Sequence, residues 1–591
     1  IEVDGYFLDG APSMSTSFLS HYLSTPRRAV SGRTDRVVVV GAGLSGLAAA
    51  VLLAGSGRSV TVVEREDHVG GRAATETVST PLGDVRVDTG ATVVTMPRLV
   101  DEILASVGLS TGDLAPDFSY QRLSPAYHAL FSSGRHLDVF ADGVGEEDAQ
   151  EAAAGSDSRL DDEIRRFARE KFDDVPHRSS NANRDEFTES RVTGVRGYRL
   201  WAQSMFDACF SHLMNADFDS VWDLVRTRES TQSLARVARR GGFGSLGRAA
   251  ERYLSDDELR KVFSFQALYA GVPPKKARAV YATISHMDTG MGVFYPTRGP
   301  HGSGVGALCD ILAAALKQSG GELMLNTRVT SLSHASHGAG SSTPHSDRIH
   351  AVETTQGTLP TDVVITTCDI PELDTISGRR GRRTMRWSPS AFVMHGAIPR
   401  QVARHWPGGH HTISFGKEWD RTFSEITAPH GRGRLMSDPS LLVTRPACSA
   451  PDLVSTSTTS PHVPIEPVSV LAPCPNTESA HIDWSSLAAS YQEDLLSVLE
   501  DRGFEGIRES FAVGKVDTPE TWSALGMGAG TPFAPAHLFR QTGPFRFRNF
   551  PVRSFSNLIH AGSSTTPGVG VPTVILSGAL AAARITRGDH P

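Results

Sequence analysis

Cysteine is scarce in this 591-residue chain, and its cysteines lie far apart. Cys209, Cys309, Cys368, Cys448 and Cys474 form no CxxC pair, and their number is odd. This pattern argues against a disulfide scaffold and against a zinc site, and it fits a reducing compartment. The sequence also contains no HExxH motif and no Ser–His–Asp signal, so no metal site and no nucleophilic triad are expected.

An excess of positive charge is absent as well. The formal net charge is −7 at pH 7, so nucleic acid is not an expected partner. Residues 1–34 lack the ordered charged, apolar and small-residue blocks of a secretory signal. We expect them to form a mobile tail that begins partly upstream of the natural start. The apolar content of 39% and the length favour a globular protein of two domains.

The stretch Val37–Gly55 lacks charge over nineteen residues, which just reaches the length of a transmembrane helix. Its first four residues, Val37–Val40, are β-branched and favour a short buried strand, and the glycines of 41–46 interrupt the run. A helix over about 44–54 and a second strand over 59–63 follow. We therefore predict a strand, turn, helix and strand rather than a membrane span.

The turn of this unit has the form GxGxxG and is followed by an acid at the end of the second strand. Gly41 allows a tight turn, Gly43 lets backbone amides approach a pyrophosphate, and Gly46 lets helix and strand pack closely. The helix N-terminus offers free N–H groups to phosphates. Glu64, eighteen residues after Gly46, can accept hydrogen bonds from a ribose. The pattern predicts a dinucleotide site.

Two further stretches bear on which dinucleotide binds. "REDHVGGRAAT" places Gly70, Gly71 and Arg72 just after the second strand, where the backbone can lie close to a ligand and an arginine can pair with a pyrophosphate. Alone, it would be an ordinary surface turn. "NLIHAGSSTTPGVGVPTVILSGALAAARI" predicts a short strand, a glycine-rich turn and a closing helix from about Val571.

The GGR element resembles that of the flavoproteins that include amine oxidases, protoporphyrinogen oxidase and carotenoid desaturases, in which it lies against FAD. In that group a C-terminal turn and helix direct backbone amides at the flavin ring. "VDTGATVVTMP" (Val87–Pro97), "GVFYPTRG" and "TPETWSALGMGAGTPF" resemble blocks of the bacterial and fungal phytoene desaturase family. The resemblance runs from about Arg36 to Ile585.

This resemblance implies FAD as cofactor, with the segment after Val87 beside the flavin and Val329 at the adenine. Together with the fingerprint, the expected cofactor-binding residues are Gly41, Gly43, Gly46, Glu64, Gly71, Arg72, Gly90, Ala91, Thr92, Val329, Gly562 and Val571. Thr566 departs from the family, because many relatives have histidine there. The polar segment 138–195 is a second departure, and we interpret it as mostly a surface insertion.

The expected fold class is α/β, with a discontinuous Rossmann-like FAD domain of the glutathione-reductase and amine-oxidase type. The resemblance places this domain at 35–130, 299–372 and 552–591. The inserted α+β substrate domain would comprise 131–298 and 373–551.

Within the substrate domain, the apolar stripe of 197–214 indicates either plain core or a tunnel wall. The arginine-rich segments 226–252 and 379–387 indicate either solvated faces or contact with anionic lipid.

The implied function is that of an FAD-dependent carotenoid desaturase in carotenoid biosynthesis, with phytoene as the expected substrate. A hydride would pass to flavin N5 and a proton would then be lost, so orientation of the polyene is the main task of the protein. No residue is identified as catalytic. Histidines 128, 410, 411 and 560 are candidates by residue type, but lone histidines are usually structural. The expected localisation is cytoplasmic with peripheral membrane attachment, and the electron acceptor stays open.

Three alternatives are kept. One is another carotenoid enzyme on the same scaffold, such as a later-step desaturase, an oxygenase or an isomerase. Another is an amine oxidase, although flavin attachment through a cysteine near the C-terminal turn is excluded because no cysteine follows Cys474. The third is a non-catalytic isoprenoid-binding escort resembling the GDP-dissociation inhibitors, which would not need all the flavin signatures found in this chain.

Overall fold

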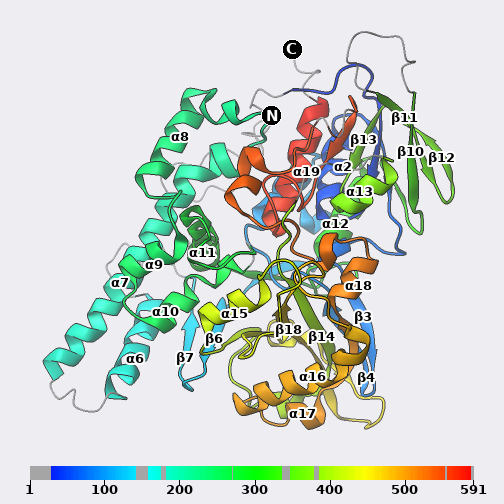
Figure 1. Cartoon of the computed structure of the whole chain (residues 1–591). Coiled ribbons are helices and arrows are strands. Elements are labelled where there is room, and N and C mark those ends of the chain that lie inside the picture. The colour runs from blue at the N-terminus through cyan, green and yellow to red at the C-terminus, as the bar shows by residue number, and fades with distance from the viewer. Residues whose placement is uncertain are drawn as a thin grey trace.

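The computed structural model describes residues 28–141, 158–174, 181–268, 271–335, 347–378, 385–550, 552 and 555–586. Two sheets form the body of the molecule, and a group of helices projects from one side (Figure 1). Each sheet is assembled from segments that are distant in the sequence. The functional residues must therefore be sought where these segments meet.

A five-stranded sheet contains both strands of the N-terminal unit. Its strands lie in the order β20, β13, β1, β2, β9, and all neighbours are parallel. In that order their bounds are Leu558–His560, Val363–Thr366, Arg36–Val40, Ser59–Val63 and Glu322–Met324. The predicted α/β fold and the predicted strands at 37–40 and 59–63 are confirmed.

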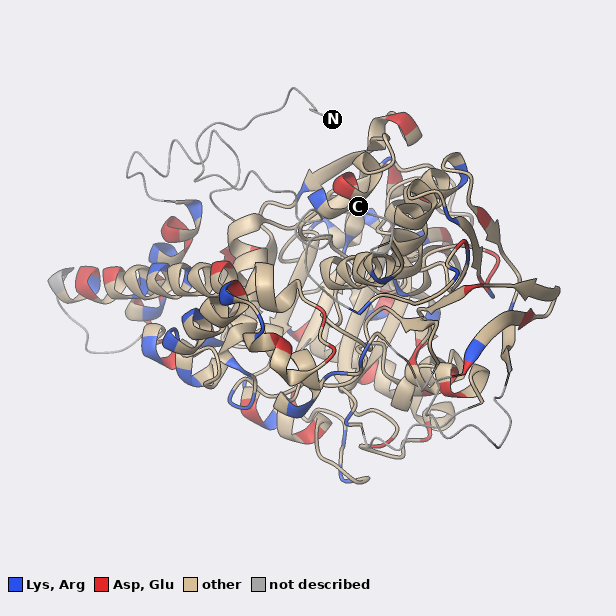
Figure 2. Cartoon of the chain, turned by 90° about the horizontal axis from the view of Figure 1, so that it is seen from above, with Lys and Arg blue, Asp and Glu red and all other residues tan. Residues whose placement is uncertain are grey.

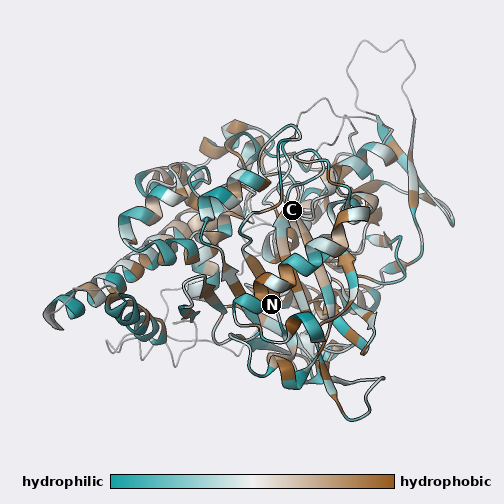
Figure 3. Cartoon of the chain, turned by 60° about the horizontal axis from the view of Figure 1, so that its bottom comes forward, coloured by the Kyte–Doolittle hydropathy of each residue, from teal (hydrophilic) through white to brown (hydrophobic). Residues whose placement is uncertain are grey.

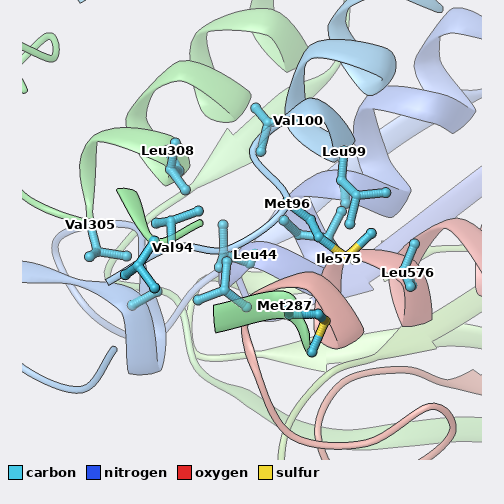
Figure 4. Close-up of a cluster of buried hydrophobic side chains, with 14 of the residues drawn as sticks. Leu44, Val94, Met96, Leu99, Val100, Met287, Val305, Leu308, Ile575 and Leu576 are labelled. Carbon is cyan, nitrogen blue, oxygen red and sulfur yellow. The ribbon is translucent and has the colours of Figure 1, made fainter. Parts of the chain in front are cut away.

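Three helices pack together on this sheet, namely α2 (Leu44–Gly55), α12 (Ala307–Gln318) and α19 (Val571–Thr586). They bury the uncharged stretch of α2 against apolar residues from the C-terminal end of the chain. Leu44 and Ile575 belong to this shared cluster (Figure 4). The predicted helices from residue 44 and from residue 571 are confirmed, and no helix within the described ranges has the length and apolarity to cross a membrane.

A mixed second sheet forms the other half of the body. Its order is β19, β14, β18, β16, β15, β6, β7, with β17 beside β18, and only the β15–β6 pair among these neighbours is parallel. The bounds are Ala512–Asp517, Ser390–Pro399, Pro464–Cys474, Leu441–Thr444, His411–Phe415, Tyr127–Phe131 and His136–Val139, and β17 is Ser455–Thr456. The expected domain boundary at residue 130 thus falls inside a strand of this sheet.

Smaller elements complete the two halves. A three-stranded antiparallel sheet contains β10 (Val329–Ala335), β11 (Arg348–Thr354) and β12 (Gly357–Pro360). The remaining strands are β3 (Thr75–Thr80) paired with β4 (Gly83–Asp88), and β5 (Ser119–Arg122) paired with β8 (Phe294–Thr297). The other helices of the body are α3 (Arg98–Ala105), α4 (Thr111–Leu114), α13 (Ile370–Ile376), α14 (Arg400–Ala403), α15 (Trp419–Ile426), α16 (Trp484–Asp501), α17 (Ile507–Ser510) and α18 (Pro519–Ala524).

The projecting helices bear on the expectation of a mostly surface insertion at 138–195, of which 142–157 and 175–180 lie outside the described residues. They are α6 (Arg159–Asp173), α7 (Asn181–Cys209), α8 (Arg228–Arg239), α9 (Leu246–Tyr253), α10 (Asp257–Val262) and α11 (Ala282–His286). Ile164 and Phe167 of α6 are fully buried in the main core. The segment has a low apolar content because most residues of its helices are charged or polar. The few apolar residues recur at helical spacing, however, so they form one buried face of α6.

The outer surfaces of these helices are polar and carry both signs of charge. Lys and Arg alternate with Asp and Glu along them (Figure 2), and apolar and polar residues alternate in the same way (Figure 3). Arg165 pairs with Glu189 at 2.7 Å, which ties α6 to α7.

Part of the expected N-terminal tail is ordered. Val30 is buried, and its N–H donates to the Arg584 carbonyl at 2.9 Å. Arg348 donates to the carbonyl of Ser31 at 2.7 Å. These contacts hold residues 28–34 against the end of α19 and the start of the strand Arg348–Thr354, so the expectation of a mobile tail is wrong for them. Residues 1–27 lie outside the described part of the chain.

Candidate functional site

A cavity of about 1590 Å³ is lined by residues of both sheets and of the projecting helices. A pocket for one small molecule generally measures about 300–1,000 Å³, so this cavity has room for two ligands at once. It brings together eleven of the twelve expected cofactor residues. Those lining it are Gly41, Gly43, Glu64, Gly71, Arg72, Gly90, Ala91, Thr92, Val329, Gly562 and Val571.

The three fingerprint glycines occupy two different environments. Gly46 faces the carbonyl of Gly41, so that any Cβ at residue 46 would overlap this oxygen. A Cβ on Gly43, in contrast, would come no closer than 3.7 Å to a protein atom. Gly43 is also the N-cap of α2 and provides no side-chain cap, which leaves the first N–H groups of the helix for a ligand. The space and the donors at this point fit a pyrophosphate.

The paired glycines of the second motif lie directly against this loop. The Gly70 N–H donates to the Ala42 carbonyl at 3.0 Å, and Gly43 and Gly70 form a parallel bridge. Arg72 does not stand free beside them, because its guanidinium donates to the Pro532 carbonyl at 2.8 Å and lies 3.5 Å from Asp369. Its expected contact with a pyrophosphate stays a prediction.

Glu64 is held in place by the backbone. One carboxylate oxygen accepts from the Ala42 N–H at 2.7 Å, and the other accepts from the Glu66 N–H at 3.1 Å. Each oxygen keeps acceptor capacity for a ribose hydroxyl. Val329 begins β10 at the same end of the cavity. The residues present therefore suit the adenosine half of FAD.

The C-terminal turn closes the other side of this end. Gly562 adopts a φ of 102°, and its N–H donates to the Ser577 hydroxyl at 3.0 Å, so the turn is fixed to α19. Residues 566, 567 and 569–574 line the cavity. Thr566 is buried here where histidine would be expected from the family. The N-terminus of α19 thus faces the same space as that of α2.

Two charged residues that the sequence reasoning missed hold this turn. Arg546 is only 2% exposed and donates to the carbonyls of Thr565 at 2.9 Å and Ser563 at 2.5 Å. Burial lowers its pKa to about 10. Asp369 accepts from the Gly528 N–H at 3.1 Å and from the Ser564 hydroxyl. Asp369 follows β13, and the carboxyl ends of parallel strands are where ligands bind, so its position carried a usable signal.

The histidines named from the sequence have structural environments. His128 contacts Asp138 at 2.5 Å, and His560 is fully buried beside Thr366 at 3.2 Å. Burial lowers the pKa of His410 to about 3 and that of His411 to about 4. Of these four residues only His411 lines the cavity, and it is neutral near pH 7.

A hydrogen-bonded chain lies behind the C-terminal turn and was also missed. Thr542 donates to the Leu538 carbonyl at 2.9 Å, so its oxygen must accept from the Tyr281 hydroxyl at 3.1 Å. The Tyr281 oxygen then accepts from Nδ1 of His537 at 2.7 Å. The ring of His537 lies against Gly568, where a Cβ would overlap it. These hydrogen bonds tie Tyr281, the residue just before α11, to His537, which packs against the turn.

The remainder of the cavity is mostly apolar. Leu213 and Met214, from the stripe at 197–214, line it, whereas Tyr198 and Met205 of the same stripe are core residues. The interpretation as a cavity wall therefore holds for the end of the stripe, and the interpretation as plain core holds for Tyr198 and Met205. Other apolar lining residues are Leu234, Ala238, Phe265, Ile284, Val393, Ile413, Phe415, Leu442, Leu471 and Trp522.

Comparisons with known proteins agree with this geometry. The family model described as flavin containing amine oxidoreductase matches residues 44–586. The chain is 42% identical over 562 residues to a phytoene dehydrogenase of Streptomyces griseus, which covers 94% of this chain and 96% of that protein. It is 29% identical over 577 residues to a neurosporene-forming phytoene desaturase of Rhodobacter capsulatus, with 94% and 95% covered.

Solved structures match at the level of the fold. An oxidoreductase from Methanosarcina mazei has a TM-score of 0.52 at 14% identity, with 92% of this chain and 98% of that chain covered. A triple mutant of putrescine oxidase has a TM-score of 0.50 at 16% identity, with 93% and 98% covered.

The glycine geometry predicts opposite effects for two alanine substitutions. Gly43→Ala should leave the thermal unfolding of the FAD-free protein unchanged and weaken FAD binding at least about tenfold, because the Cβ fills space meant for the ligand. Gly46→Ala should lower the unfolding temperature instead, because its Cβ meets the Gly41 carbonyl. Thermal scans and FAD fluorescence titration measure the two effects. Wild-type FAD affinity in Gly43→Ala would contradict the assignment.

The Arg546 contacts predict a large loss of stability. Arg546→Met should lower the free energy of unfolding by about 3 kcal/mol, because two buried carbonyls lose their donors. Arg236, which is exposed on α8, supplies the control: Arg236→Met should change it by less than about 0.5 kcal/mol. Urea unfolding measures both, and equal values for the two variants would refute the holding role of Arg546.

Proposed function

Because the chain belongs to the flavin-containing amine oxidoreductase family, and within it to the carotenoid desaturases, we propose that it desaturates a C40 polyene, phytoene being the expected substrate. FAD is the cofactor. The single observation that carries the proposal is the shape of the cavity, which joins a dinucleotide cradle to a long apolar chamber without a wall between them.

The division of the chain follows from the same observation. We propose that 35–130, 299–372 and 552–591 hold FAD and that 131–298 and 373–551 hold the substrate. The strands of the parallel sheet lie within the first set, while β6 crosses the boundary between the two. The twelve cofactor residues named from the sequence are proposed as FAD contacts, except that Gly46 acts through packing.

FAD, when bound, supplies a hydride acceptor for the removal of two hydrogens from adjacent carbons. The chain's own residues position it: the glycine loops admit its phosphates, Glu64 is placed to accept from a ribose, and the N-termini of α2 and α19 direct N–H groups into the cavity. The apolar walls exclude water and align the polyene. Orientation is therefore the main catalytic contribution of the protein.

A hydrocarbon substrate offers no polar group for recognition. Moving dozens of carbons out of water at about 0.8 kcal/mol each would exceed any realistic binding energy. In lipid this driving force nearly vanishes, so the length and shape of the chamber should set specificity. The substrate must also reach the chamber from a membrane.

An apolar rim supports entry from a bilayer. Val221, Phe243 and Phe539 line the cavity and are 44%, 43% and 50% exposed, so the cavity opens to the surface at these residues. Trp222 and Val225 of η3 (Val221–Val225) are 79% and 48% exposed in the same segment.

Basic residues follow this rim in the sequence. Of the seven arginines in 226–252, all but Arg240 are exposed. Apolar side chains beside arginines are typical of surfaces that dock on anionic lipid. We propose peripheral attachment of this face to a membrane. In the other basic segment, 379–384 lie outside the described residues, Arg386 is exposed, and the partly exposed ring of Trp387 packs on Gly528.

The desaturase activity is tested by incubation with phytoene. The FAD-loaded protein and phytoene-containing liposomes should yield carotenoids with longer conjugation, which chromatography and visible absorption detect. The same protein given a fully desaturated carotenoid should yield no further conjugation. Products that carry oxygen, or isomers without added double bonds, would instead indicate another carotenoid enzyme.

Membrane docking is tested by a substitution that introduces a negative charge into the apolar rim. Trp222→Glu should weaken sedimentation with anionic liposomes at least about tenfold, because burial of a Trp side chain contributes about 2 kcal/mol and a carboxylate is repelled by the lipid. Leu200→Glu is the matched control, since Leu200 is 66% exposed on α7 and does not line the cavity. If both variants bind like the wild type, this face is not the docking face.

A further inference from the structure

One carboxyl group faces the cavity without an ionic partner. Asp288 lies in the π-helical turn η6 (Met287–Met291), which continues α11. It is surrounded by protein, yet it is partly exposed because it lines the cavity. Single π-turns inside helices are often found at functional sites.

The other acids of the cavity wall are engaged by donors or cations. Glu76 pairs with Lys515 at 3.1 Å, and Glu372 lies 3.5 Å from Arg328. Glu64 and Asp369 accept backbone N–H groups. Within the described ranges, no ion pair of Asp288 is found, and the buried side chain of Gln266 is its polar neighbour. Asp288 is therefore a cavity carboxyl that no cation neutralises within the described ranges, and it is available to accept a proton.

The position of Asp288 is fixed relative to the expected flavin segment. Phe294, six residues further on, exchanges two 2.8 Å backbone hydrogen bonds with Val94, and Val94 follows the expected flavin contact Thr92 by two residues. Met287 joins Leu44 in the cluster beneath the cofactor end (Figure 4). Asp288 therefore lies where the apolar chamber meets the cofactor end of the cavity.

The surroundings of Asp288 make it a base suited to neutral pH. Burial raises its pKa to about 7, and the neighbouring polar side chain of Gln266 opposes the rise. The elements α7 and α11 contact this turn, and their titratable groups include Arg199 and Cys209 of α7, Tyr281 just before α11 and His286 of α11. Burial raises the pKa of Cys209 and raises that of Tyr281 to about 12, and it lowers the pKa of His286 to about 4, so these three are neutral at pH 7.

Arg199 supports the turn rather than the carboxylate. Its guanidinium donates to the Thr289 carbonyl at 2.6 Å. The turn that carries Asp288 is thus held from α7 without an ion pair that would suppress the basicity of the carboxylate.

We propose that Asp288 is the proton acceptor of the desaturation. This role rests on the proposed function. One hydrogen of the polyene would leave as hydride, with the electron pair of its C–H bond, to bound FAD, and the adjacent C–H bond would break heterolytically. Its electron pair forms the new double bond, and its proton passes to the Asp288 carboxylate, which becomes a neutral carboxylic acid. An acceptor that is about half ionised at neutral pH matches a general base.

Asp288→Asn tests the role through activity and its pH dependence. The wild-type rate with phytoene should rise with pH through about 7, as the carboxylate ionises. The variant should be about 10²-fold slower and independent of pH in this range. Asp288→Glu should restore part of the rate together with the pH dependence. Asp207→Asn, an exposed acid on α7, should match the wild type.

A second readout needs neither cofactor nor substrate. Between about pH 4 and pH 7 the unfolded chain releases the Asp288 proton while the folded chain retains it, so this group reduces stability as the pH rises. Asp288→Asn should therefore raise the urea midpoint relative to the wild type at pH 8 and by much less at pH 4, where the folded carboxyl is neutral and the unfolded one, with its ordinary pKa of 3.8, is only about half ionised.

The outcomes separate the two claims. An active wild type with an equally active, equally pH-dependent Asp288→Asn variant overturns the proton-acceptor role alone. A wild type that desaturates no polyene overturns the proposed function and this role with it, while the urea measurement still reports the titration of the carboxyl. An Asn variant that is slow but retains the wild-type pH profile also overturns the role, because it indicates loss of packing only.

Discussion

The close packing of α2 against α19 is the contact on which the site depends. Gly578 of α19 lies so near the Ser45 carbonyl of α2 that a side chain at 578 would overlap it. This contact joins the first described helix to the last one. Because both helices begin at the cavity, it places the N-terminal fingerprint and the C-terminal turn around one space. Neither end of the chain forms a cofactor site alone.

Charge is distributed in the cavity in a way that suits two chemically different ligands. Polar contacts gather at the sheet ends, where Arg72, Asp369 and the backbone amides lie. The chamber beyond is bounded by aliphatic and aromatic side chains, and its acid Asp288 has no cation paired with it. Such a chamber fits a hydrocarbon, whose reaction needs alignment and a site for one proton, better than it fits a charged amine.

The sequence predicted those parts of the molecule that local pattern determines. The β-branched run, the spacing of the fingerprint glycines and the closing helix each depend on a few adjacent residues, and they occur where expected. The meeting of Gly43 with Gly70 could also be anticipated, since both follow strands of one parallel sheet. The residues that the sequence did not predict depend on long-range contacts. Arg546 is recognised as important only because it donates to the C-terminal turn, and Asp288 only because it lines the cavity.

The segment 138–195 shows the limit of composition as a guide. Its charges outnumber its apolar residues, yet α6 places the few apolar ones on one buried face. Arg72 has a contact that its motif did not indicate, because its guanidinium lies 3.5 Å from Asp369, while its expected contact with a pyrophosphate stays a prediction. A sequence motif identifies the type of side chain that a site needs. The folded structure is required to show which other side chains, such as Asp369, contact that residue.

The most direct test of the shared cavity is a single turnover in the absence of oxygen. The FAD-loaded protein is mixed with phytoene liposomes, and the flavin and polyene absorption bands are followed together. Flavin absorbance should fall as conjugated double bonds form, mole for mole, within the same kinetic phase. A yellow, folded protein whose flavin band is unchanged by phytoene or by any other C40 polyene would contradict it.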